Sequence, residues 1–95
     1  HKEGMKNLEK LLRGLGNRRR LAILQLLIKY QRLSVGELAS SIGLSFKSTS
    51  RHLRIMRQLE FVDFEQRGTT VYYFLSPAIP VPAHAILKYI PNSRD

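Results

Sequence analysis

The stretch over residues 34–59 constrains the fold more than any other part of the chain. Ser34 and Glu37 have the spacing of a capping box, in which a serine hydroxyl and a glutamate carboxylate satisfy free amides at a helix start. Gly43 can take the left-handed conformation that ends a helix, and Ser45 is suited to cap the next one. The stretch therefore predicts two helices joined by a tight turn, which is the helix-turn-helix arrangement.

The second of these helices has a basic side and an apolar side. At about 100° per residue, one stripe contains Lys47, Arg51, Arg54 and Gln58, whereas the opposite side contains Thr49, Leu53 and Met56. A basic helix by itself is usually only a solvated face. The helix and turn that precede this one favour a helix presented to a nucleic-acid groove, with Ser48 and Ser50 beside the basic stripe.

His52 lies in the same predicted helix, so it is also a candidate DNA contact. Its helical angle is closer to that of Met56 than to that of Lys47. We therefore favour a partly buried packing role for His52.

Composition limits the classes of protein that the chain can represent. The 95 residues suit one domain over 1–95, and 16 Lys and Arg against seven Asp and Glu give a net charge of +9, which favours a polyanionic partner. A generically basic small protein would also fit this charge. The absence of cysteine excludes a disulfide framework and a thiolate metal site. No membrane-spanning run or signal-peptide pattern is visible, so we expect a cytoplasmic protein without membrane association.

Catalytic signatures are missing from the sequence. It contains no recognisable Ser/His/Asp set, phosphate-binding loop or dinucleotide fingerprint. We expect neither an enzyme nor a bound cofactor.

The first 30 residues predict two helices. Residues 1–15 form an amphipathic pattern, and the second helix runs from Arg18 to about Tyr30 with Asn17 as its cap. The expected core face of the second helix consists of Leu21, Leu24, Leu27 and Ile28, with Ile23 on its flank. The arginines at 18–20 oppose the helix dipole, so they invite an acidic neighbour or a phosphate, or else remain solvated.

Residues 61–75 predict a β-hairpin. Two β-branched and aromatic segments flank the turn from Gln66 to Thr69, which contains Gly68. A hairpin after a helix-turn-helix is a wing, and Arg67 at its tip could meet a phosphate or the minor groove. The complete set of expected DNA contacts is Lys47, Ser48, Ser50, Arg51, Arg54, Arg67 and Thr69.

The segment 80–91 predicts a short terminal helix from Ala83 to Ile90, with Pro82 in its first turn. A helix of this length is unstable alone, so it should dock on the first helix of its own chain or of a partner. Because both terminal helices lie outside the central unit, we expect them to form a dimer contact, with packing within the chain as the alternative for the first helix. The expected contact residues are Met5, Leu8, Leu12, Leu15, Ile86, Tyr89 and Ile90.

Three segments, LGNRRRLAIL, LSVGELASSIGLSFKSTSRHLRIMRQLEFV and GTTVYYFLSP, together resemble the ArsR/SmtB family of winged-helix bacterial and archaeal repressors. The resemblance covers about residues 15–77. It implies a mainly α fold with a small β-hairpin, in the winged helix-turn-helix order α-α-α-α-β-β-α. It also implies a homodimer that places two recognition helices in successive major grooves of double-stranded DNA, with repression relieved by an effector. By position, Lys47, Ser50 and Arg51 match places where the family meets DNA, and Arg67 matches the wing tip.

The sequence departs from the family pattern at three places. Phe46 stands where many members have a polar residue that reads DNA, and Glu60 replaces the glycine that usually ends the recognition helix. The family's metal-sensing cysteine pair corresponds here to residues 34–36, and the terminal helix offers only His84. We therefore expect no metal site.

The leading hypothesis is a sequence-specific DNA-binding transcriptional regulator, a homodimeric repressor that binds an inverted-repeat operator. The alternative is a winged-helix module that binds protein or RNA in a larger assembly. A specificity ratio well above nonspecific duplex binding would favour the regulator.

Overall fold

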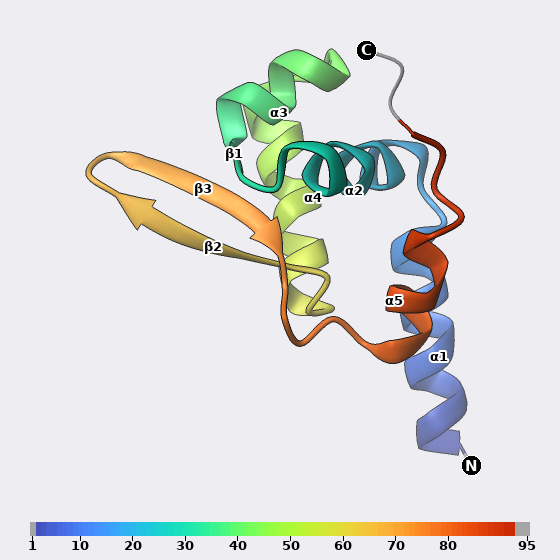
Figure 1. The fold of residues 1–95 in the computed structure, drawn as a ribbon. Helices are drawn as coiled ribbons and strands as arrows, with labels where there is room; N and C mark the ends of the chain where they lie inside the picture. Colours follow the sequence, from blue (N-terminus) through green and yellow to red (C-terminus); the bar gives the residue numbers. More distant parts are fainter. Residues whose placement is uncertain (1, 93–95) are drawn as a thin grey trace.

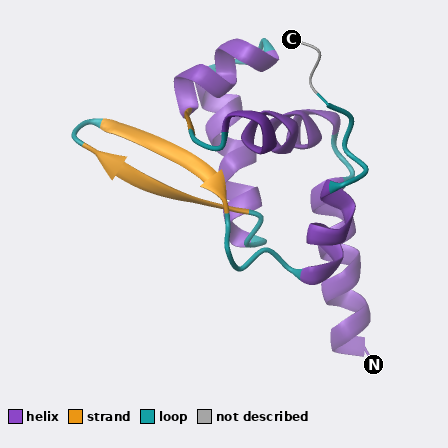
Figure 2. Ribbon diagram, viewed as in Figure 1, coloured by secondary structure: helices purple, strands orange, loops and turns teal. Residues whose placement is uncertain are grey.

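The computed structural model describes residues 2–92, which form five helices and one three-stranded sheet (Figures 1 and 2). The helices are α1 (Lys2–Leu15), α2 (Arg18–Tyr30), α3 (Val35–Ile42), α4 (Phe46–Gln58) and α5 (Val81–Leu87). The strands are β1 (Leu33–Ser34), β2 (Val62–Arg67) and β3 (Thr70–Leu75). This order confirms the predicted winged helix-turn-helix. Figure 1 shows the β2–β3 hairpin projecting from one side of the helices.

The ends of α3 and the start of α4 follow from the predicted local signals. The Glu37 amide donates to the Ser34 hydroxyl at 3.1 Å, and the Ser34 amide donates to the Glu37 carboxylate at 2.8 Å, which completes the capping box. Gly43 ends α3 with a φ of 66°, in the left-handed region. The Ser48 amide then donates to the Ser45 hydroxyl at 3.0 Å and caps α4. The helix-turn-helix is thus specified by side chains within it.

The core forms between α2, α3, α4 and the sheet. Thr49, Leu53 and Met56 are fully buried, as the periodicity of α4 predicted. On α2 the prediction needs correction: Ile23 is fully buried, whereas Ile28 is 41% exposed. The buried side of α2 is centred on Leu27, which faces the other helices and β3, and Ile28 lies about 100° away from that centre.

α1 contributes to the same core at its C-terminal end. Leu11 and Leu15 are buried, and a Cβ atom added at Gly14 would clash with Leu59 Cδ1, so α1 approaches the end of α4 closely. Leu15, expected at a dimer contact, is therefore a core residue of its own chain. The leucine periodicity alone could not separate these two roles, because it does not say which part of the stripe crosses the domain.

The sheet contains one strand that the sequence did not predict. β1 has two residues and pairs antiparallel with β3, with Leu33 opposite Tyr73, so the strand order is β1-β3-β2. Arg67 pairs with Thr70, which leaves Gly68 and Thr69 as a two-residue turn, with Gly68 at a φ of 61°. β1 leads directly into α3, so the middle of β3 is joined to the helix-turn-helix.

α5 is shorter than predicted at its C-terminal end and starts earlier. It runs from Val81 to Leu87, and Pro82 lies in its first turn as expected. Tyr89 and Ile90 follow the helix in a turn, where their amides bond three residues back to the carbonyls of Ile86 and Leu87. α5 lies against α1 of the same chain, and Ala83 is fully buried there (Figure 1).

Glu60 keeps the left-handed conformation in which the family usually has glycine, with a φ of 62°. A side chain with a Cβ atom is strained in this region, so Glu60→Gly should raise the free energy of unfolding by up to about 1 kcal/mol. Urea denaturation measures this change. Glu60→Ala retains the Cβ atom and should give no comparable gain; an equal gain from both variants would show that the backbone is not strained.

Candidate nucleic-acid interface

The outer face of α4 carries cations without neighbouring acids. Lys47, Arg51 and Arg54 are exposed, and none of them forms an ion pair with another residue of the 2–92 segment. α4 itself contains no Asp or Glu. Ser48 and Ser50 are half-buried on either side of this basic stripe. The stripe therefore offers uncompensated positive charge together with hydroxyl groups, which suits contact with phosphates and base edges.

A groove of about 430 Å³ separates the start of α4 from the hairpin. Ser50 lines it from α4 and Thr69 lines it from the wing tip, so two residues predicted as separate contacts face one space. Phe46 also lines this groove and is 62% exposed. α4 and the wing thus form two sides of one concave surface.

Arg57 has a different role from the cations of the basic stripe. Its Nε atom lies 3.4 Å from an Asp63 carboxylate oxygen, and its guanidinium carbon lies 4.2 Å from the centre of the Phe64 ring. Both partners belong to β2. Arg57 therefore connects the C-terminal part of α4 to the base of the wing.

In the middle of β2, Glu65 binds two arginines. Its Oε2 atom lies 2.9 Å from Arg67 Nε, and its Oε1 atom lies 2.6 Å from Arg32 Nη1. The hydrogen bond with Arg67 is the largest cause that lowers the pKa of the Glu65 carboxyl, and the same bond raises the pKa of Arg67. Arg67, expected to meet a phosphate or the minor groove, is thus paired with an acid, while Thr69 is exposed beside it.

Two of the three arginines at 18–20 have partners that the sequence did not reveal. Arg20 donates to the carbonyls of Gly14 at 2.7 Å and Arg13 at 3.2 Å, and Arg19 donates to the carbonyl of Ile42 at 3.3 Å. These carbonyls lie at the C-terminal ends of α1 and α3, where cations are favourable against the helix dipole. From the sequence, the expected partners were an acid, a phosphate or water. The carbonyl partners were not foreseen, because they belong to the ends of other helices.

His52 has the partly buried position that we favoured. Its Nδ1 atom lies 3.3 Å from Arg20 Nη1, and because a guanidinium only donates, Nδ1 accepts. Burial is the main cause that lowers the pKa of His52, followed by the charges of Arg20, Arg51 and Arg19. His52 therefore supports the contact between α4 and α2 in its neutral form.

Neither a metal site nor a membrane-spanning helix is found among the described residues. Over residues 2–92, no group of three or more His, Cys, Asp and Glu side chains is placed to hold a metal ion. Within the same part of the chain, none of the helices has the length and apolar content needed to cross a bilayer.

Comparison of the sequence with known proteins relates the chain to a family of regulatory proteins. The profile of the family described as "Bacterial regulatory protein, arsR family" matches residues 17–63. The transcriptional activator HlyU of Vibrio cholerae is 42% identical over 66 residues, which are 70% of this chain and 60% of HlyU. The nodulation protein NolR of Rhizobium meliloti is 37% identical over 84 residues, which are 88% of this chain and 63% of NolR. The matched segments thus span less than two thirds of these relatives.

The solved structures agree with the sequence relatives. HlyU from Vibrio cholerae superposes with a TM-score of 0.78 at 32% identity, covering 94% of this chain and 92% of that chain. The fold and the basic α4 define a winged helix-turn-helix protein. The chain belongs to the ArsR family of bacterial regulatory proteins. The family is described as bacterial regulatory proteins and HlyU as a transcriptional activator, which supports the expectation of a non-enzymatic protein.

The lowered pKa of His52 predicts a pH dependence of stability. The folded state takes up this proton less readily than the unfolded state, so the stabilisation is complete above the usual pKa of 6.5 and is lost as the pH falls through the lowered pKa. The thermal midpoint of the wild type should therefore fall more between pH 7.5 and pH 5 than that of His52→Gln. His84→Gln, which changes an exposed residue of α5, should keep the wild-type profile. Identical profiles for all three proteins would contradict this assignment.

Proposed function

We propose that the protein is a sequence-specific transcriptional regulator that binds double-stranded DNA through α4 and the wing. We further propose that it acts as a homodimeric repressor at an inverted-repeat operator. The single observation that carries the proposal is the acid-free basic stripe of α4, Lys47, Arg51 and Arg54, on the outside of a helix whose opposite side is fully buried. A helix presented in this way fits the major groove.

Each contact has a role in this proposal. Lys47, Arg51 and Arg54 neutralise phosphates, which supplies affinity without regard to sequence. Ser48 and Ser50 meet phosphate oxygens or base edges, and Arg67 and Thr69 reach the neighbouring phosphates or the minor groove. The net charge of +9 strengthens the long-range attraction.

The basic stripe predicts a specific change in salt dependence. Lys47→Ala and Arg51→Ala should each weaken duplex binding and reduce the slope of log affinity against log salt by about 0.9, because each removes one phosphate contact. Fluorescence anisotropy with a duplex selected from a random library measures both quantities.

Lys10→Ala serves as the matched control, since Lys10 is an exposed cation on α1. Its affinity and slope should equal those of the wild type. If both α4 variants also keep the wild-type slope, the stripe does not contact DNA, and the alternative of a protein- or RNA-binding module gains support.

The apolar side of α4 predicts an effect on folding. Leu53 is fully buried, so Leu53→Ala should lower the free energy of unfolding by about 2–5 kcal/mol. Urea denaturation monitored by circular dichroism measures the loss. A variant as stable as the wild type would show that α4 is not held by this face.

The dimer proposal rests on exposed apolar side chains of the two ends of the chain. Met5, Leu8 and Leu12 of α1 are 69%, 41% and 52% exposed, and Tyr89 is 73% exposed. Ile86 is also exposed, and Ile90 is half-buried. Contiguous apolar surface of this kind favours association. A two-fold axis through this surface would place the two α4 helices about 34 Å apart, which corresponds to successive major grooves.

The dimer is tested by changing α1 without removing its core residues. The double variant Leu8→Gln, Leu12→Gln should shift the wild-type dimer towards monomer in sedimentation equilibrium at micromolar concentration. Lys6→Gln, Lys10→Gln changes two exposed polar positions of the same helix and should remain dimeric. A wild-type monomer, or a dimer that the leucine changes leave intact, would remove these residues from the interface.

A further inference from the structure

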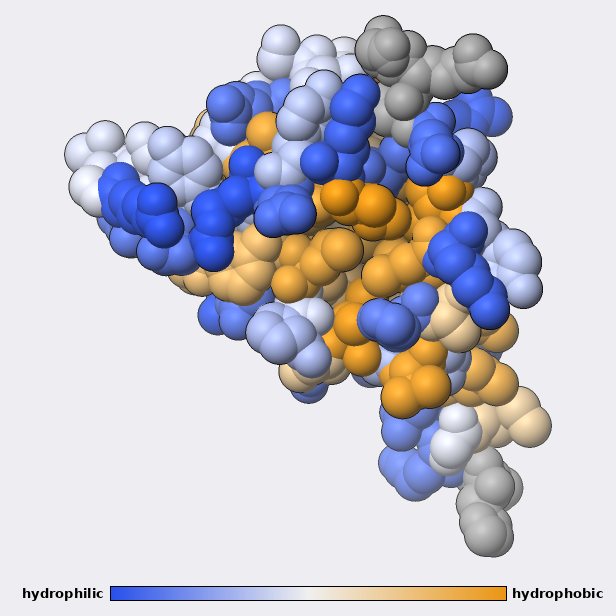
Figure 3. Space-filling model, viewed as in Figure 1, coloured by the Kyte–Doolittle hydropathy of each residue, from blue (hydrophilic) through white to orange (hydrophobic). Residues whose placement is uncertain are grey.

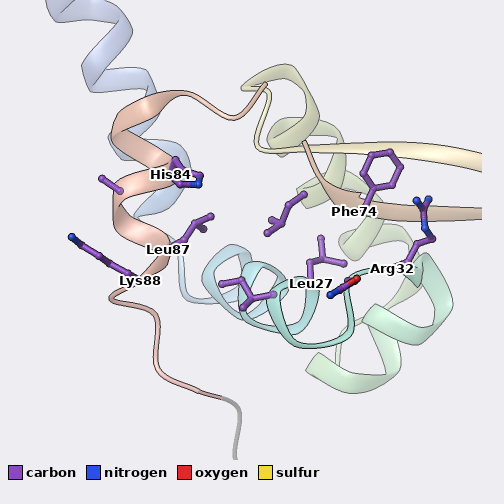
Figure 4. Close-up of a pocket in the computed structure, with 10 residues that line it drawn as sticks. Leu27, Arg32, Phe74, His84, Leu87 and Lys88 are labelled. Atoms are coloured by element: carbon purple, nitrogen blue, oxygen red, sulfur yellow. The ribbon is translucent and has the colours of Figure 1, made fainter. Parts of the chain in front are cut away.

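A second concave surface lies between α2, β3 and α5, away from the α4 face (Figure 4). It is a groove of about 810 Å³, which is within the range of small-molecule sites. Its apolar walls include Leu27 of α2, Phe74 of β3 and Leu87 of α5. Figure 3 shows a band of hydrophobic surface that runs from the base of the hairpin towards α5. The groove would therefore bury the surface of a bound apolar molecule away from water.

The polar part of the groove carries two cations, Arg32 and Lys88. Gln31 and His84 also line it, and no Asp or Glu is among the lining residues. Figure 4 shows Arg32 beside Phe74 on the wing side, and His84 and Lys88 on α5. Apolar walls with cations at the rim fit a molecule with an apolar body and an anionic end.

Among the cations that line the groove, Arg32 has the most favourable geometry for binding that anionic end. Its guanidinium carbon lies 4.6 Å from the centre of the Phe74 ring, which restricts its motion. Only Nη1 makes a side-chain hydrogen bond within the described residues, so the other guanidinium N–H groups are available to a carboxylate. Arginine binds carboxylates in a bidentate manner.

Arg32 also connects the groove to the wing tip. Glu65 accepts a hydrogen bond from Arg32 at 2.6 Å and one from Arg67 at 2.9 Å, and it uses a different oxygen for each. An anion bound to Arg32 would neutralise one of the two cations that balance Glu65. The Glu65 carboxylate would then hold Arg67 more strongly, and its negative charge would oppose a nearby DNA phosphate.

We propose that this groove binds a small organic carboxylate with an apolar body, and that its occupation weakens DNA binding through Arg32, Glu65 and Arg67. The regulatory part rests on the proposed function, whereas binding of the carboxylate does not. Because exposed ion pairs are individually weak, the expected coupling is about fivefold, at the lower end of allosteric effects. DNA should lower the affinity for the carboxylate by the same factor.

The first experiment measures ligand binding to the DNA-free protein by calorimetry, with octanoate as the probe. Saturable binding to one site per chain is expected for octanoate, with weaker binding of 1-octanol and none of acetate. Arg32→Gln should weaken octanoate binding at least tenfold, whereas Arg13→Gln, which changes an exposed arginine of α1, should leave it unchanged. Absence of saturable octanoate binding, or wild-type binding by Arg32→Gln, would overturn the site.

The second experiment repeats the DNA titration with octanoate at saturation. The wild type should lose about fivefold in duplex affinity, whereas Glu65→Gln should bind octanoate but keep the same duplex affinity with and without it. An unchanged wild-type affinity, or an equal loss in Glu65→Gln, would overturn the coupling. A protein that binds octanoate but no duplex would refute the proposed function while leaving the ligand site intact.

Discussion

The burial of three side chains on one side of α4 decides what the molecule presents to its surroundings. Thr49, Leu53 and Met56 are fully buried, and the Thr49 hydroxyl donates to the Ser45 carbonyl at 2.8 Å, so its burial leaves no unpaired polar group. Burying an apolar side chain such as that of Leu53 or Met56 stabilises the fold by about 1.5–3 kcal/mol. Because a helix turns by about 100° per residue, this burial fixes the basic stripe on the outside.

The cations of the chain divide into structural and exposed groups, and net charge alone cannot separate them. Arg19 and Arg20 bind carbonyls at the ends of α3 and α1, and Arg57 joins α4 to β2. The basic stripe of α4 has no such partners within the described residues. Arg20, through His52, and Arg57 connect α4 to α2 and β2, whereas Arg19 connects α2 to α3. Part of the net charge of +9 therefore belongs to arginines that hold the fold together, while the cations of the α4 stripe are free of ion pairs within the described residues.

Local signals in the sequence were sufficient to predict most of the fold. The capping box of Ser34 and Glu37, the left-handed Gly43 and the two-faced periodicity of α4 are each contained within a few residues, and the structure confirms them. Features that depend on distant partners were missed or misplaced. β1 has only two residues and exists because β3 is beside it. Ile23 is buried in the core in place of Ile28, and this depends on where α2 meets the sheet.

The candidate site shows the same division. Exposure of Lys47, Arg51 and Arg54 followed from helical periodicity, because the apolar residues on the other side demanded a core. The pairing of Arg67 with Glu65 could not be foreseen, since it depends on the register and length of the hairpin turn. The groove beside Arg32 needs α2, β3 and α5 together. Sequence reasoning therefore located the helix but not the contacts that connect the wing to the rest of the domain.

The most direct test of the central claim is the map of amide chemical-shift changes when the ¹⁵N-labelled protein is titrated with a selected duplex. If α4 enters the major groove beside the wing, the largest changes should cluster at residues 45–54 and 67–70, and the exposed polar side of α1 should change little. Changes centred on α1 or on the α2–α5 groove, with α4 unaffected, would contradict the account.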